Sequence, residues 1–179
     1  MAMLSHMQHT APLTRIVRPQ LPFDHLNPNL KSMTADSLPP VRFQEIVSNG
    51  HSTIVARMKI PTPHGHAFVI HRLDTNAISL TSLYRAAFST ANDNAEEDES
   101  DWVKANYDGS GLNDGSGGKA YFAGTWINPG VAKELAESYT LAHIVTPLIK
   151  AKPDHKVLDT RCSLGPAQAF RPMNLHGRA

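Results

Sequence analysis

Cysteine is almost absent from this sequence of 179 residues, which contains a single thiol at Cys162. One cysteine excludes a disulfide framework and a cysteine-rich zinc site, and it is typical of a reducing compartment. No run of about 18 apolar residues occurs, so we expect no membrane span in this chain. The N-terminus lacks a basic region followed by an apolar stretch, which argues against a secretory signal. Neither charge dominates, because 17 bases against 16 acids leave a net charge of +1, a balance that neither requires nor excludes nucleic acid.

Motifs for catalysis and cofactor binding are also missing. The glycine-rich segment 109–118 contains no phosphate-binding motif, because Asn113 and Ala120 stand where a P-loop requires glycine and a hydroxyl residue. The three histidines within 64–71 have no cysteine nearby and no carboxylate that would complete a metal site. No Gly-x-Ser-x-Gly nucleophile elbow is present. We therefore expect no catalytic residues, no cofactor, no metal and no enzymatic activity.

Proline divides the chain into a central part and two ends. Residues 1–40 hold six of the 13 prolines and little apolar periodicity, which predicts a flexible proline-rich arm. Residues 151–179 contain three more prolines and mostly basic charges, which predicts a flexible basic tail. The folded domain is expected at about residues 41–150.

The order of elements in this domain predicts its fold class. Two β-rich runs flank Asn49-Gly50, the strongest short hairpin signal, and 67–73 reads as a third strand. Residues 78–90 place apolar side chains on one helical face, with Ser79 as a cap. A second helix is expected from about Asn94, then a glycine-rich wing, a strand, and a helix that starts at Asn128-Pro129. This order predicts an α+β fold, a small antiparallel sheet with a helix-turn-helix and a glycine wing.

The second predicted helix is acidic. Residues 93–101 carry six acids and no base, so the remaining chain holds 10 acids and 17 bases. A solvated helix face is the ordinary interpretation. In a helix-turn-helix, however, the second helix usually enters the DNA major groove, where phosphates would repel these acids.

Three segments together resemble the KilA-N/APSES domain of fungal nuclear proteins. They are "AISLTSLYRAAF" at 77–88, "GGKAYFAGTWINP" at 117–129 and "VAKELAESYTLAHIVTPLI" at 131–149. The resemblance implies a non-enzymatic module of winged-helix type in the nucleus, either a transcription regulator or a chromosome-tethering protein. The acidic second helix makes the pattern closest to the bouquet-type branch, which links telomeres to the nuclear envelope chiefly by binding protein partners.

Two kinds of partner follow from this resemblance. The first is duplex DNA, held weakly and electrostatically by the wing and by nearby bases. The candidate DNA-binding residues are Gly117, Gly118, Lys119, Tyr121, Lys104, Arg85, Arg72, Arg57 and Lys59. The second is a nuclear protein partner peptide. Trp126 is expected to close the core between sheet and helix.

Overall fold

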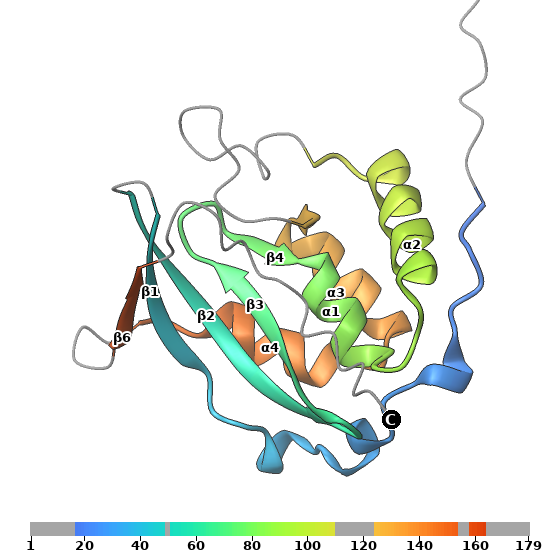
Figure 1. The fold of residues 1–179 in the computed structure, drawn as a ribbon, viewed down its shortest axis with the longest axis horizontal. Coiled ribbons are helices and arrows are strands. Elements are labelled where there is room, and N and C mark those ends of the chain that lie inside the picture. Colours follow the sequence, from blue (N-terminus) through green and yellow to red (C-terminus); the bar gives the residue numbers. More distant parts are fainter. Residues whose placement is uncertain (1–16, 49–50, 110–123, 154–157, 164–179) are drawn as a thin grey trace, which may run out of the picture.

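The computed structural model describes residues 17–48, 51–109, 124–153 and 158–163 (Figure 1). Three short 3-10 turns come first: η1 Phe23–His25, η2 Pro28–Ser32 and η3 Ala35–Ser37. The strands are β1 Arg42–Ser48, β2 His51–Thr62, β3 Gly65–Arg72, β4 Ala77–Ser79, β5 Trp126–Ile127 and β6 Leu158–Ser163. The helices are α1 Leu80–Ala87, α2 Asp93–Asn106, α3 Pro129–Ser138 and α4 Ala142–Lys150.

The strands form one sheet in the order β5-β4-β3-β2-β1-β6. Strands β1 to β5 pair antiparallel, and β6 joins the edge parallel to β1. The pairing of β1 with β2 begins at Ser48 and His51, on either side of the predicted Asn-Gly turn. These pairings confirm the α+β class with a small antiparallel sheet. The glycine wing predicted before β5 lies outside the described residues.

The helices cover one face of the sheet and build the main core against it (Figure 1). Ala56, Met58 and Ile60 point to this face from alternate positions of β2, as the two-residue period of a strand requires. They share a buried cluster with Leu83 of α1 and Leu135 of α3. The apolar face predicted for α1 is therefore the face that closes the core.

Helix starts follow local side chains. The Ser79 hydroxyl accepts a hydrogen bond from the Ser82 amide, and Asn128 Oδ1 accepts one from the Val131 amide at 2.9 Å. Both caps were predicted from sequence. Helix α2 begins earlier than predicted, because Asn92, and not Asn94, caps it by accepting from Ala95 N at 2.8 Å.

Residues 17–40 pack against the domain, although the sequence suggested a flexible arm. Leu30 and Met33 are buried in the main core. Asn27 is fully buried, and its Nδ2 donates to the carbonyls of Pro61 and Ala86 at 2.9 and 3.0 Å. One buried amide thus ties the segment to the end of β2 and to α1. At the other end, residues of the predicted basic tail supply strand β6.

Trp126 occupies the face of the sheet opposite the helices. It is buried with Ile46, Val55 and Ala77 in a second, smaller cluster, whereas its neighbour Ile127 enters the main core. The prediction that Trp126 packs between sheet and helix is therefore wrong by one position. In a two-residue strand, adjacent side chains point to opposite faces, and the sequence pattern did not decide which one points inward.

Candidate functional site

The face of the sheet turned away from the helices carries a basic surface. Arg57, Lys59 and Pro61 alternate along β2 with the core residues Met58 and Ile60, so their side chains share this outer face. Arg57 and Lys59 were both candidate DNA-binding residues. The structure brings these two together.

A hollow of about 770 Å³ lies on this outer face, and we refer to it as the sheet hollow. Its floor and walls come from β1, β2, β3 and the segment before β1. The lining residues are Pro39, Pro40, Arg42, Arg57, Lys59, Pro61, Gly65, His66 and Phe68. Three of these residues are bases, and none of them is an acid. The sheet hollow therefore combines positive charge with proline and phenylalanine walls.

Phe68 organises the aromatic part of the sheet hollow. The Arg57 guanidinium carbon lies 4.9 Å from the centre of the Phe68 ring, within the range of a cation–π contact. The His66 ring meets the same phenyl group edge-on at 5.1 Å. Arg57 Nε is shielded from solvent and has no hydrogen-bond partner among the described residues. A buried charged donor without a partner is unfavourable, so a ligand that supplies an acceptor to Arg57 Nε would be bound favourably.

A second arginine of the sheet hollow lies opposite Arg57 in the register of the sheet. Arg42 of β1 pairs in register with Arg57 of β2. Both arginines line the sheet hollow.

Arg72, another candidate, is buried, with only 2% of its side chain exposed. Its Nε and Nη2 donate to the two carboxylate oxygens of Asp74 at 3.1 and 2.7 Å. Burial acts to raise the pKa of Asp74, but hydrogen bonds and charge from Arg72 outweigh it and lower this pKa below its ordinary value. The Arg72 guanidinium also lies over the Trp126 ring at 5.4 Å. Arg72 therefore stabilises the interior and is out of reach of a nucleic acid.

Two further candidates are exposed but engaged by acids of α2. Arg85 Nε lies 2.6 Å from Glu96 Oε2, and Lys104 Nζ lies 3.0 Å from Asp101 Oδ1. Both bases are on the helical side of the molecule, away from the sheet hollow. The remaining candidates, Gly117, Gly118, Lys119 and Tyr121, lie outside the described residues, so their DNA contact stays a prediction.

Glu99 is a structural residue that the sequence analysis treated as one more acid of a solvated helix. Its side chain is 1% exposed and accepts hydrogen bonds from Arg18 Nη2 and the Tyr139 hydroxyl, each at 2.6 Å. Burial and the Glu99 charge raise the pKa of Tyr139 above its ordinary value. One sequence signal was present, because Glu99 lies one turn before Val103 on the buried helix face.

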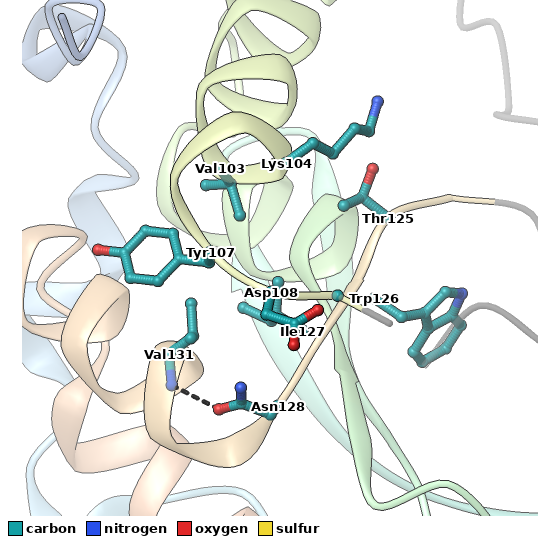
Figure 2. Close-up of a pocket in the computed structure, with 10 residues that line it drawn as sticks. Val103, Lys104, Tyr107, Asp108, Thr125, Trp126, Ile127, Asn128 and Val131 are labelled. Carbon is teal, nitrogen blue, oxygen red and sulfur yellow. Dashed lines mark hydrogen bonds between the residues drawn. The ribbon is translucent and has the colours of Figure 1, made fainter. Parts of the chain in front are cut away.

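A much smaller pocket lies between the end of α2, β5 and the start of α3 (Figure 2). Its volume is about 30 Å³, room for roughly one water molecule. Val103 and Val131 point toward each other from α2 and α3, whereas the Trp126 ring points away from them (Figure 2). This pocket is too small for a side chain of a partner.

The described residues show neither a metal-binding cluster nor a membrane-spanning helix. No group of three or more histidine, cysteine or acidic side chains in these segments is placed to hold a metal ion. None of the helices there is long and apolar enough to cross a bilayer.

Comparison with known proteins finds relatives of this chain in sequence and in structure. No family model matches the sequence. It is similar to Bouquet formation protein 4 of Schizosaccharomyces pombe, with 30% identity over 131 residues, which are 70% of this chain and 28% of that protein. The crystal structure of the N-terminal domain of Bqt4 from S. pombe aligns with a TM-score of 0.60 and 26% identity, covering 72% of this chain and 96% of that one. A structure of a DNA complex of PCG2 aligns with a TM-score of 0.42 and 15% identity, covering 66% and 96%.

These findings support homology to the N-terminal domain of Bqt4. The chain spans only 28% of the length of the curated relative it matches, so the similarity concerns one part of that protein. The relation to the KilA-N/APSES group stays a prediction from the sequence motifs.

Proposed function

We propose that this chain is an interaction domain of a nuclear chromosome-tethering protein of the bouquet type, without enzymatic activity. In this proposal its main partner is a protein, and sequence-specific DNA reading is not its task. Support comes first from the similarity to the N-terminal domain of Bqt4, which extends over 96% of that domain. The name of the relative assigns it to bouquet formation, and the same setting is proposed for this chain.

The observation that carries the protein-binding part is the charge on α2. This helix is in the position that would enter the major groove in a helix-turn-helix protein. Its only base, Lys104, is paired with Asp101, while Asp93, Glu97 and Asp98 are exposed. Phosphates would repel this surface, and none of its acids would be neutralised by DNA.

Weak duplex binding is the second candidate, because Arg57 and Lys59 share one face with Arg42. Three neutralised phosphates would give a log–log salt slope of about −3 and little preference among sequences. Any contact of Lys119 in the wing with a phosphate would add to this electrostatic binding. Such binding would assist a tethering protein without specifying a site.

A titration with labelled duplexes separates the two. We expect fluorescence anisotropy to show weak binding at about 50 mM salt, equal for unrelated sequences, and none at about 200 mM. Replacing Glu97 and Asp98 by glutamine and asparagine should strengthen the weak binding, because it removes exposed negative charge. Tight, sequence-selective binding that survives the higher salt would contradict the proposed function.

A further inference from the structure

The sheet hollow has a chemistry that fits one class of ligand. It offers three cationic side chains, Arg42, Arg57 and Lys59, and no carboxylate in its lining. Its volume of about 770 Å³ falls within the range of pockets that bind ligands, roughly 300–1,000 Å³. The positive charge of the sheet hollow therefore favours an anionic ligand, and its volume can hold a ligand larger than a single ion.

The apolar walls decide between kinds of anion. Pro39, Pro40, Pro61 and Phe68 surround the bases, and proline supplies no backbone N–H to a phosphate. A sugar–phosphate backbone carries a charged phosphate at every unit and has no alkyl side chain to bury against these walls. An unstacked base would need the face of an aromatic ring, but the Arg57 guanidinium already lies 4.9 Å from the centre of the Phe68 ring. A peptide segment with both carboxylate and aliphatic side chains fits both parts of the lining.

We propose, building on the protein-binding function above, that the sheet hollow binds a short acidic segment of a partner protein. One aspartate or glutamate carboxylate of that segment accepts hydrogen bonds from Arg57, including its buried and unpartnered Nε, with Lys59 adding charge. An adjacent aliphatic side chain of the partner packs against Pro61 and Phe68.

Nuclear magnetic resonance titration of the whole 179-residue chain tests this proposal. The probe is an acetylated Gly-Ser-Glu-Leu-Glu-Ser-Gly peptide. The matched probes replace both glutamates by glutamine or the leucine by serine, and an oligothymidylate of similar length represents nucleic acid. We expect the Glu-Leu-Glu peptide to shift the Arg57 side-chain Nε–H signal and the backbone amides of 57–68, and each matched peptide to bind more weakly.

Three single substitutions test whether the peptide binds in the sheet hollow. Arg57→Gln should weaken binding of the acidic peptide by about tenfold or more, the size of one charge-assisted hydrogen bond. Lys59→Gln repeats the test at an exposed position where loss of packing plays no part. Lys133→Gln removes the same charge from the exposed surface of α3 and should leave the affinity unchanged.

Four results would overturn the inference. They are no shift with the acidic peptide, shifts confined to another surface, equal binding by the glutamine peptide, or preferential binding of oligothymidylate in the hollow. None of them by itself removes a protein-binding role elsewhere on the domain. That role fails on a different result, the salt-resistant, sequence-selective duplex binding described above.

Discussion

The buried ion pair of α2 provides a sharp test of how the domain is held together. Glu99 accepts from Arg18 Nε at 3.1 Å, from Arg18 Nη2 at 2.6 Å and from the Tyr139 hydroxyl at 2.6 Å. Arg18 also donates to Ser138 Oγ at 3.1 Å and lies 4.7 Å from the centre of the Trp102 ring. Glu99→Gln keeps the shape of the side chain and removes only its charge.

The structure sets the expected magnitude. Removing one member of a buried ion pair costs about 3–5 kcal/mol when the remaining charge stays buried. Arg18 keeps 27% of its side chain exposed, so water can hydrate part of its charge, and glutamine still accepts from Tyr139. We therefore expect a loss of about 2 kcal/mol, which for a domain of this size lowers the Tm by about 4–8 °C.

Urea denaturation and thermal unfolding, both followed by circular dichroism, measure this loss. Glu97→Gln is the matched control, because Glu97 lies on the same helix and is exposed; its effect should stay within about 0.5 kcal/mol. A double-mutant cycle with Arg18→Gln should show coupling of at least about 1 kcal/mol. Equal effects of Glu99→Gln and Glu97→Gln, or additive losses in the cycle, would refute the reasoning.

Two further predictions concern the N-terminal segment and the tyrosines. Leu30→Ala should lower the free energy of unfolding by about 3 kcal/mol in urea denaturation, because Leu30 is 5% exposed in the main core. The control Val17→Ala, at an 87% exposed position, should cost almost nothing. A loss below about 1 kcal/mol for Leu30→Ala would place the segment outside the core. Burial and nearby carboxylates raise the pKa of Tyr84 and of Tyr107 to about 12. The contribution of these two phenols to stability is present in full below about pH 10, the ordinary pKa of tyrosine, and is lost as the pH rises toward 12. Tyrosinate absorbance should therefore show titration at the ordinary pKa only for exposed tyrosines. An unfolding midpoint that stays unchanged across this pH window would contradict the assignment.

Local chemistry explains what the sequence predicted correctly. Leu80, Leu83, Tyr84, Ala87 and Phe88 recur at helical spacing, and all five are buried in the main core. The two predicted caps and the hairpin likewise depend on residues only a few positions apart. Each of these features is encoded within one or two turns of chain, so a periodic pattern is enough to identify it.

Contacts between distant segments explain what was missed. Glu99 looks like any acid of a charged run until Arg18, far away in the sequence, supplies its partner. Arg72 looks like a surface base on an alternating strand until Trp126, far away in the sequence, lies against its guanidinium. Asn27 sits in a proline-rich stretch with no apolar period, yet its amide is satisfied by two carbonyls of the folded domain. In each case the deciding group becomes a neighbour only in the fold.

The same pairings show why the net charge of +1 says little about the partner. Within the described part of the chain, Arg18, Arg72, Arg85 and Lys104 each face a carboxylate at 3.0 Å or less. Their charges are offset where they lie, whereas the described lining of the sheet hollow around Arg57 and Lys59 contains no acid. Exposed acids gather on α2, on the helical side of the sheet. An acidic partner is therefore repelled from one side and attracted to the other, so that the charge distribution orients the partner before contact.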